Sequence, residues 1–312
     1  MHNLPVGRTG QSNPNRRRWS LVAGGAVALL AIAGGVTAFT LSQGTGTPTA
    51  NAPVAPEPKA TPAPPPTRTP TPSPAPSATP EPVYDLAGLP IQDAFAIQPQ
   101  LPLDDEPGGG FTGLVAAPKA DAIPVFASAD AAQPIAMLPR TNSYGDTAVP
   151  VVRFGDGLRA QVLLPGRQAA PSPGQIAGWV RLADVQLTQA AATVEVNLRD
   201  RTLDIVHADG SHERVASDFG WGAPETPTPL GRTFIMTTIP DAAPYVRGHL
   251  VVYTGQQSQT IAGFDGASVA VVAFHYYDDR SGPISNGCIR LDAAAIDRMA
   301  QLPAGTPVRV FQ

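Results

Sequence analysis

A proline-rich segment constrains the folding of this 312-residue chain more than any other feature. From 44 to 82 the sequence is dominated by Pro, Thr, Ala and Ser, a composition that cannot bury a hydrophobic core. Pro-rich chain favours the extended polyproline II conformation, which rises about 3.1 Å per residue. Residues 104–110 have the composition of a further loop or hinge. We therefore expect residues 42–110 to form a disordered linker.

An apolar stretch precedes this linker. Residues 21–41 contain no charged side chain and follow shortly after three arginines at 16–18. Such a helix spans about 30 Å, the thickness of the hydrocarbon core of a bilayer, and the arginines favour the cytoplasmic side. We expect a cytoplasmic N-terminus over residues 1–20 and a single transmembrane signal anchor over residues 21–41, in a bacterial cell membrane. Cleavage as a signal peptide is the alternative, with 50–52 as the nearest candidate site.

This topology places everything after the anchor outside the cytoplasm. The linker would then hold a folded domain about 100 Å or less from the bilayer, a reach that suits work on a layer above the membrane.

The charge balance argues against nucleic acid as a partner, because 21 Lys and Arg stand against 25 Asp and Glu. No basic cluster occurs outside the N-terminus, whereas proteins that bind nucleic acid present a basic patch.

Residues 111–190 have the pattern of a small β domain. Short β-prone runs, such as 149–154 and 160–164, are separated by Gly, Asp, Asn and Pro turns, which is typical of a small barrel or sandwich. Residues 124–126 resemble the opening strand of bacterial SH3-like domains, and residues 178–185 resemble their final strand and turn. The resemblance implies an SH3-like barrel, which in that family often binds the cell wall or acts as a spacer.

Residues 191–312 have the pattern of a second and larger β domain. Alternating runs at 194–198 and 202–206, then an Asp-Gly turn at 209–210 and a run at 213–216, predict a β-meander. Further strands are predicted at 233–237, 249–253, 269–274 and 307–311.

One good helix is predicted near the end of the chain. It begins after Asp292, which is a suitable N-cap, and runs to about Leu302 with Ile296, Met299 and Ala300 on one face. The expected fold class is therefore mainly β, with a small barrel followed by a mixed sheet and one main helix.

The chain contains one cysteine, Cys288, which lies thirteen positions after His275. A thiol must lose its proton to attack a carbonyl, and an imidazole that titrates near neutrality can take that proton. A lone thiol outside the cytoplasm has no disulfide partner within its own chain, which suggests a reactive sulfur or intermolecular pairing. The alternative is that Cys288 is a small buried hydrophobe.

Three elements in this order resemble a known family. Residues 226–231 read Thr-Pro-Thr-Pro-Leu-Gly and precede a β run, His275 ends a later apolar run, and residues 285–290 read Ser-Asn-Gly-Cys-Ile-Arg. The chain from about residue 193 onward is similar to the YkuD-type L,D-transpeptidases. The resemblance implies a mostly β catalytic domain that acts on peptidoglycan stem peptides without a metal or other cofactor.

By this resemblance Cys288 is the nucleophile, attacking the carbonyl that links the third residue of a tetrapeptide stem to its terminal D-alanine. His275 is the base that takes the thiol proton and later activates an acceptor amine, which gives a 3→3 crosslink. Water in place of the amine gives carboxypeptidase activity. Gly287 leaves room for the tetrahedral intermediate, and the Gly287 and Cys288 amides are candidate donors to its oxyanion.

The neighbouring residues have open roles. Arg290 either orients the carboxylates of the stem or braces the loop, and Ser285 either polarises the imidazole or simply shapes the turn. Asn286 replaces a histidine, and Tyr276 replaces a glycine, that the family commonly has at these positions. Both belong to the predicted substrate site together with Tyr253.

For Tyr276, Tyr277 and Tyr253, packing is the alternative role. The remaining histidines lack acidic partners at ligand spacing, which argues against a zinc site.

Two other functions stay open: a sortase-like cysteine transpeptidase, and a catalytically silent wall-binding protein. A carbapenem, whose strained amide resembles that of the acyl donor, is expected to acylate Cys288 only if the chain is an enzyme of the resembled kind.

Overall fold

The computed structural model of the chain describes residues 82–143 and 145–312. The predicted cytoplasmic N-terminus, the transmembrane anchor at 21–41 and most of the Pro-rich linker lie outside these residues. Within the described ranges, no helix has the length and hydrophobicity that a bilayer crossing requires.

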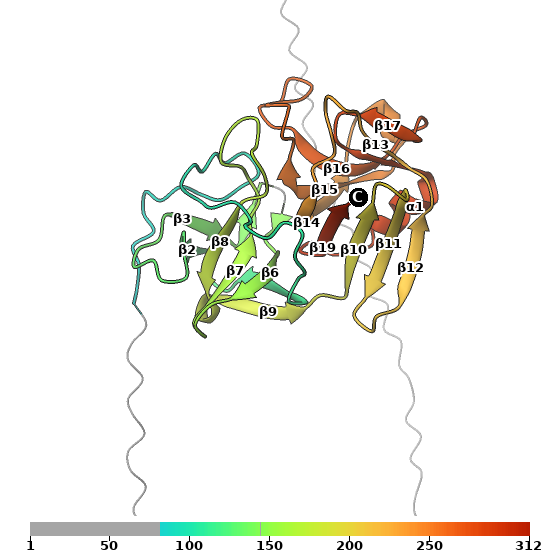
Figure 1. The fold of residues 1–312 in the computed structure, drawn as a ribbon. Helices are drawn as coiled ribbons and strands as arrows, with labels where there is room; N and C mark the ends of the chain where they lie inside the picture. Colours follow the sequence, from blue (N-terminus) through green and yellow to red (C-terminus); the bar gives the residue numbers. More distant parts are fainter. Residues whose placement is uncertain (1–81, 144) are drawn as a thin grey trace, which may run out of the picture. The chain divides into compact units, whose positions relative to one another are not determined.

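Residues 82–190, here called the first β region, contain a five-stranded antiparallel sheet and two small hairpins (Figure 1). The strand order of the larger sheet is β8-β7-β6-β1-β9, β2 pairs with β3, and β4 pairs with β5. A short 3-10 helix, η1 (Leu182–Asp184), joins the last two strands. The strands are β1 (Leu114–Pro118), β2 (Ala122–Val125), β3 (Ala136–Pro139), β4 (Thr141–Asn142), β5 (Gly145–Asp146), β6 (Val149–Phe154), β7 (Arg159–Leu163), β8 (Ala177–Arg181) and β9 (Val185–Gln189).

Close packing of β-branched side chains forms the core of this region. Val125, Val162 and Val180 are fully buried, as β-branched residues often are on a pleated surface. Gly178 lies where a Cβ atom would come within 2.7 Å of the side chains of both Leu164 and Val125, so any larger residue would have to displace them. The prediction of a small β domain is confirmed in its β content, whereas the SH3-like assignment stays a prediction.

Residues 82–110 are folded against the rest of the protein, whereas the sequence predicts a disordered linker over residues 42–110. Leu101 is 1% exposed and packs in the first core. Asp104 forms an ion pair with Arg232, and each side chain is 2% exposed. The Arg232 Nε donates to Asp104 at 2.9 Å, and its Nη1 donates to the Gly110 carbonyl at 2.7 Å. Scattered apolar residues and one buried ion pair therefore order a segment whose composition suggests a loop.

Residues 191–312, the second β region, form a ten-stranded mixed sheet with the order β12-β11-β10-β19-β14-β15-β16-β18-β13-β17. Three pairs are parallel: β10 with β19, β16 with β18, and β13 with β17. The strands are β10 (Ala192–Asn197), β11 (Thr202–His207), β12 (His212–Ala216), β13 (Gly220–Gly222), β14 (Gly231–Pro240), β15 (Leu250–Gln257), β16 (Val271–Tyr276), β17 (Gly282–Ser285), β18 (Ile289–Leu291) and β19 (Pro307–Phe311), and a short 3-10 helix, η2 (Pro244–Val246), lies between β14 and β15.

Strand β14 contributes to both hydrophobic cores. Phe234 and Met236 pack in the core of the first β region, whereas Ile235 packs in the core of the second. Successive side chains of a strand point to opposite faces, so one strand serves two cores. This explains why β14 is buried over most of its length.

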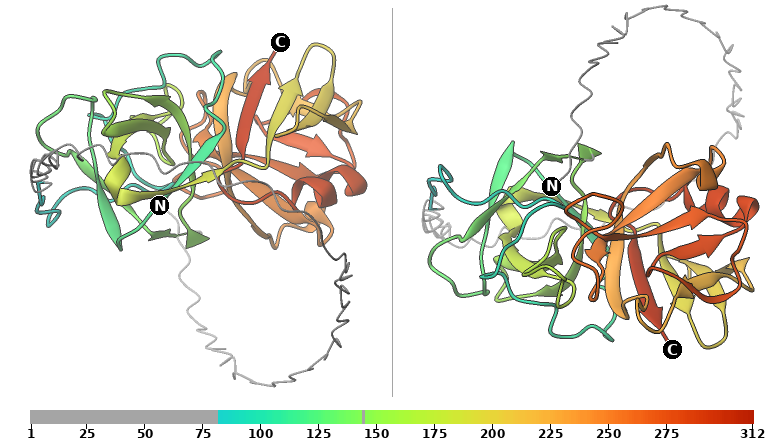
Figure 2. Two further views of the ribbon diagram at one scale, coloured as in Figure 1. Left: turned by 90° about the horizontal axis from the view of Figure 1, so that it is seen from below. Right: turned by 90° about the horizontal axis from the view of Figure 1, so that it is seen from above.

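The helix α1 (Ala293–Met299) covers one face of the second sheet and lies against β12, β15 and β16 (Figures 1 and 2). The Asp292 side chain caps it by accepting from the Ala295 N–H at 2.8 Å. Ile296 and Met299 are fully buried. The predicted N-cap and the mainly β fold class with one helix are confirmed, and the helix ends three residues before the predicted Leu302.

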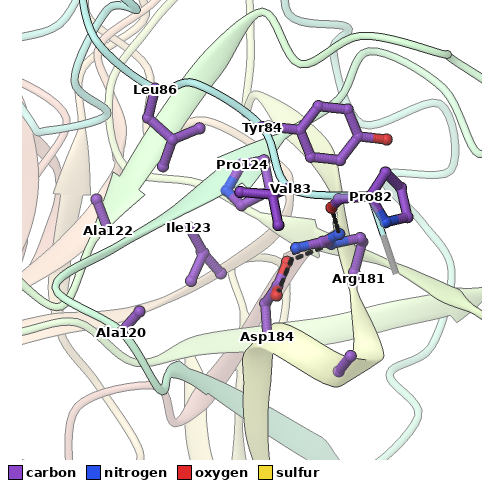
Figure 3. A pocket seen from close by; sticks show the side chains of 11 residues that line it. Pro82, Val83, Tyr84, Leu86, Ala120, Ala122, Ile123, Pro124, Arg181 and Asp184 are labelled. Carbon is purple, nitrogen blue, oxygen red and sulfur yellow. Dashed lines mark hydrogen bonds and ion pairs between the residues drawn. The ribbon is translucent and has the colours of Figure 1, made fainter. Parts of the chain in front are cut away.

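A hollow of about 320 Å³ lies in the first β region. Figure 3 shows Arg181 at its edge, where the guanidinium binds the Asp184 carboxylate at 2.6 Å and the Pro82 carbonyl at 2.5 Å. Tyr84 also lines the hollow and packs edge-on against Phe126. None of the predicted catalytic residues lies there.

Candidate active site

The predicted base lies on strand β16, and the predicted nucleophile immediately precedes the neighbouring strand β18. The parallel register of the two strands pairs Phe274 with Ile289 and His275 with Arg290. Because side chains alternate along a strand, His275 and Arg290 share one face, and Cys288, two positions before Arg290, lies on that face too. Phe274 and Ile289 point to the opposite face and pack in the core with α1.

His275 is held in a tautomer that suits a base. The residue is 8% exposed, and its Nδ1 lies 2.9 Å from the Tyr276 carbonyl oxygen. A carbonyl only accepts hydrogen bonds, so Nδ1 carries the proton and Nε2 keeps a free lone pair. Burial lowers the pKa of His275, and the Arg290 cation lowers it further, while the bond to Tyr276 opposes the shift. At neutral pH the imidazole is therefore uncharged and able to accept a proton.

Cys288 rests as a neutral thiol. The side chain is partly buried against the small apolar cluster of Val246, Val251 and Ala273. Burial raises the pKa of the thiol, and a hydrogen bond with the Ala273 backbone and the charge of Arg290 only partly oppose this. The reactive thiolate must therefore form by proton transfer to a base during the reaction.

The turn before Cys288 depends on a glycine and a serine. Gly287 has φ of 107°, a conformation that residues with a Cβ atom rarely adopt. Its N–H donates to the Ser285 hydroxyl at 3.2 Å, and that hydroxyl donates to the Cys288 carbonyl at 2.5 Å. Ser285 thus closes the turn. Because the Gly287 amide is engaged with Ser285, the Cys288 amide is the better candidate donor to an oxyanion.

The threonines of the Thr-Pro-Thr-Pro-Leu-Gly segment support this turn from the side. The Thr226 hydroxyl donates to the Ser285 carbonyl, and the Thr228 hydroxyl donates to the Gly287 carbonyl, each at 2.9 Å. The Thr228 oxygen also accepts from the Gly222 N–H at 2.9 Å. A Cβ atom on Gly222 would lie 2.2 Å from the Thr228 nitrogen, so the two segments pack backbone to backbone. The threonine segment and the turn before Cys288, two separate parts of the sequence motif, are therefore hydrogen-bonded to each other.

Two tyrosines form an aromatic wall beside His275. The ring centroid of Tyr245, in η2, lies 5.4 Å from that of His275 and 5.3 Å from that of Tyr277. Tyr245 is 42% exposed, so its ring covers the histidine and also faces solvent. The Arg290 guanidinium stacks 3.9 Å above the Tyr277 ring. The sequence analysis missed Tyr245, because it lies in an irregular loop with no periodic pattern.

An acidic group also lies within electrostatic range of the histidine. The Tyr253 hydroxyl donates to the Asp241 carboxylate at 2.6 Å, and the Ala243 N–H donates to it at 2.8 Å. These bonds lower the pKa of Asp241, and a positive charge on His275, when the imidazole is protonated, lowers it further. Asp241 is the second site residue that the sequence analysis missed, since nothing in the sequence relates it to His275.

A model of the L,D-transpeptidase catalytic domain, YkuD, matches residues 191–310. This part of the chain belongs to the YkuD family. The match covers the whole candidate site, from the threonine segment through His275 to Arg290. No curated protein matches the chain.

Solved structures similar to this chain include several L,D-transpeptidases. L,D-transpeptidase 3 from Mycobacterium tuberculosis is 13% identical over 51% of this chain and 93% of that chain, with a TM-score of 0.32. An L,D-transpeptidase from Mycobacterium smegmatis is 15% identical over 53% of this chain and 99% of that chain, with a TM-score of 0.29. The catalytic domain of the E. faecium L,D-transpeptidase is 23% identical over 38% of this chain and 96% of that chain, with a TM-score of 0.27.

Tyr276 and Asn286, two predicted substrate residues, do not belong to the aromatic wall formed by Tyr245 and Tyr277. Tyr276 points to the face opposite His275, where it stacks on His249 at 4.9 Å and donates to Asp278 at 2.7 Å. The structure therefore does not bring Tyr276 together with Cys288. Asn286 is exposed at the tip of the catalytic turn. Tyr253, in contrast, packs in the same small cluster as Cys288.

Proposed function

We propose that this chain is a cell-wall L,D-transpeptidase in which Cys288 forms a thioester with a peptidoglycan tetrapeptide stem. The observation that carries the proposal is the shared face of β16 and β18. There the register sets Arg290, two residues after Cys288, beside His275, whose Nε2 keeps a free lone pair, and the neutral Cys288 thiol needs a base.

The first half of the reaction releases D-alanine. His275 Nε2 takes the thiol proton as the sulfur attacks the carbonyl that precedes the terminal D-alanine. The Cys288 amide stabilises the oxyanion of the tetrahedral intermediate, a contribution worth about 3–4 kcal/mol of barrier in comparable enzymes. The intermediate collapses when the carbon–nitrogen bond breaks and His275 returns the proton to the departing amine.

The second half transfers the acyl group. His275 takes a proton from an incoming amine, which attacks the thioester and displaces the Cys288 thiolate, and His275 then returns the proton to the sulfur. When the amine is the side chain of the third residue of a neighbouring stem, the product is a 3→3 crosslink. When water attacks instead, the products are a shortened stem and free enzyme. The protein thus acts as a carboxypeptidase whenever the acceptor is excluded.

Arg290 and Tyr245 are the residues best placed to orient the donor stem. Arg290 shares the face of Cys288, and its stacking on Tyr277 fixes the guanidinium plane. A guanidinium in fixed orientation is suited to binding a carboxylate. The partly exposed ring of Tyr245 offers an apolar wall for the stem.

The location of this activity follows from the sequence. We propose a single-pass anchor at 21–41 and an extracytoplasmic catalytic domain, with an SH3-like barrel between them as a spacer or wall-binding module. The apolar stretch, the Pro-rich linker and the basic N-terminus support this topology.

The test uses defined muropeptides and mass spectrometry. Incubation of the protein with a disaccharide tetrapeptide is expected to release D-alanine and to give a dimer joined through the third residues of two stems. A Cys288→Ala chain is the control and should give neither product. If the folded wild-type protein releases no D-alanine, a silent wall-binding function is favoured instead. Cleavage within a protein sorting peptide, without activity on stems, would favour a sortase.

A further inference from the structure

The connection from β14 to β15 brings a carboxylate to the face of the sheet that carries the candidate reactive residues. The Asp241 side chain accepts hydrogen bonds from the Tyr253 hydroxyl at 2.6 Å and from the Ala243 N–H at 2.8 Å. Both Tyr253 and Ala243 pack against the small apolar cluster that also contacts Cys288. The carboxylate therefore lies within the reach of one tyrosine side chain from that cluster.

The strand register places the same tyrosine in line with the cysteine. Tyr253 on β15 pairs with Ala273 on β16, and the parallel pairing of Phe274 with Ile289 sets Ala273 beside Cys288. Residues that pair across neighbouring strands point to the same face of the sheet. Tyr253, Ala273 and Cys288 therefore form one row, in which two strand spacings, about 10 Å, separate the first residue from the last.

The base lies between two opposite charges on this face. In the sheet order β15-β16-β18, His275 belongs to the middle strand. Arg290, which the proposed function assigns to the donor carboxylate, lies on the β18 side, whereas Asp241 is bound to Tyr253 on the β15 side. His275 must serve both the thiol and the incoming amine. We therefore expect the acceptor on the side of the base that Arg290 does not occupy.

The Asp241 carboxylate is charged and can accept further hydrogen bonds. Its bonds with Tyr253 and Ala243 lower the pKa of the carboxyl group, so it is ionised at neutral pH. Within residues 82–143 and 145–312, no cationic side chain forms an ion pair with it. A carboxylate has about four acceptor positions, and the residue is partly exposed. An ammonium group can therefore reach it from solvent.

We propose that Asp241 binds the ammonium group of the acyl acceptor and so favours an amine over water as the group that consumes the acyl-enzyme. This inference rests on the proposed function, since it assigns a residue to the second half of that reaction. The acceptor nitrogen is positive as an ammonium, loses one proton to solvent, and becomes positive again as it bonds to the thioester carbon. His275 then moves the second proton to the Cys288 sulfur as the carbon–sulfur bond breaks. A carboxylate beside the nitrogen stabilises both positive stages.

The experiment measures how one acyl-enzyme divides between two products. The protein is incubated with a disaccharide tetrapeptide, and mass spectrometry gives the ratio of the 3→3 dimer to the hydrolysed tripeptide. Both products arise from the same thioester, so the ratio does not depend on how fast Cys288 is acylated. Asp241→Asn removes the charge and keeps an oxygen for the Ala243 N–H. Each ratio is measured at about 0.05 M and about 0.5 M salt, because salt screens exposed charges.

Asp278→Asn is the matched control. Asp278 accepts from the Tyr276 hydroxyl at 2.7 Å, a bond of the same type made by a tyrosine on the opposite face of the sheet, and it pairs with Arg247. The Asp278→Asn chain should have the wild-type ratio and the wild-type salt dependence. A fall equal to that of Asp241→Asn would show that net charge, and not position, sets the ratio, and would overturn the inference.

For Asp241→Asn we expect the ratio at low salt to fall about threefold to fivefold, the upper part of the range for an exposed ion pair. High salt should lower the wild-type ratio and should change that of Asp241→Asn less. An unchanged ratio in Asp241→Asn, or equal salt dependence in both chains, would overturn the inference. If Asp241→Asn does not fold, Asp241→Ser also keeps an oxygen without the charge, and the same results are expected of it. A wild-type ratio that salt does not change would overturn the inference without any variant.

The wild-type products separate this inference from the proposed function. Failure of the folded wild type to release D-alanine counts against the proposed function. Release of D-alanine and formation of the dimer, with a ratio that Asp241→Asn does not change, count against the inference alone.

Discussion

Adjacent residues of β16 and β18 point to opposite faces of the sheet. One face carries mainly apolar side chains, and the other carries the candidate reactive side chains. On one face Phe274 and Ile289 are about 1% exposed and pack with α1. On the other face His275, Cys288 and Arg290 lie beside tyrosines and a carboxylate. The alternation of a β-strand thus assigns stability to one face and reactivity to the other. Substitutions one position apart should separate the two properties.

The largest expected effects come from the neighbours His275 and Phe274. His275→Ala removes the base, and acylation by a carbapenem should slow by about 10²–10⁴-fold, as for the loss of a general base. The midpoint of thermal unfolding should change little, because the lost side chain borders the site rather than the core. Stopped-flow or mass-resolved acylation kinetics give the rate.

Phe274→Ala is the counterpart on the opposite face. Truncation of a fully buried phenylalanine leaves a cavity and should lower the free energy of unfolding by about 3–5 kcal/mol. The fraction that stays folded at low temperature should still be acylated at close to the wild-type rate. Urea unfolding combined with acylation kinetics tests both statements, and a rate as low as that of His275→Ala would break the comparison.

A smaller effect is expected from the threonine that supports the catalytic turn. Thr228→Val removes the bonds to the Gly287 carbonyl and the Gly222 N–H, which leaves buried polar groups unsatisfied at a cost of about 1–3 kcal/mol. Acylation should slow about tenfold because the turn loses its support. Thr254→Val is the control, since Thr254 is equally buried and donates to the Val272 carbonyl at 2.7 Å, away from the turn. It should lose stability but keep its rate, and equal rates in both variants would argue against the support.

The smallest effect is on the pH dependence of stability. Burial lowers the pKa of His275 in the folded protein, whereas in the unfolded chain it titrates near 6.5. As the pH falls through 6.5, the His275 imidazole binds a proton in the unfolded chain but stays unprotonated in the folded protein. The free energy of unfolding therefore decreases toward acid pH. The wild type should therefore lose more stability between pH 7.5 and pH 5.5 than His275→Ala does. Equal losses in urea unfolding at the two pH values would show that His275 titrates normally.

The same contrast explains what could be predicted from the sequence. Strands β10, β11 and β19 alternate clearly and were predicted, as was the Asp292 cap of α1. Strands β13, β17 and β18 have only three or four residues, too few for a periodic pattern, and they include the strand that follows Cys288 and pairs Arg290 with His275. The motif identified the reactive residues, but not how they come together.

Residues fixed by non-local contacts could not be predicted. Tyr245 and Asp241 lie in the irregular connection between β14 and β15, and their relation to His275 exists only in the folded sheet. Asp104 is ordered by Arg232, a partner 128 positions away. For this reason the segment before residue 110 resembles a linker in the sequence and is part of the core in the structure.

The central claim is that Cys288 is a nucleophile, activated by the residues on the face of the sheet that carries His275 and Arg290. Its most direct test is intact-protein mass spectrometry after incubation with a carbapenem, followed by peptide mapping. The account predicts a single stoichiometric adduct on the peptide that contains Cys288, and no adduct on a folded Cys288→Ala chain. A folded wild-type protein that stays unmodified, or an adduct that persists in Cys288→Ala, would contradict it.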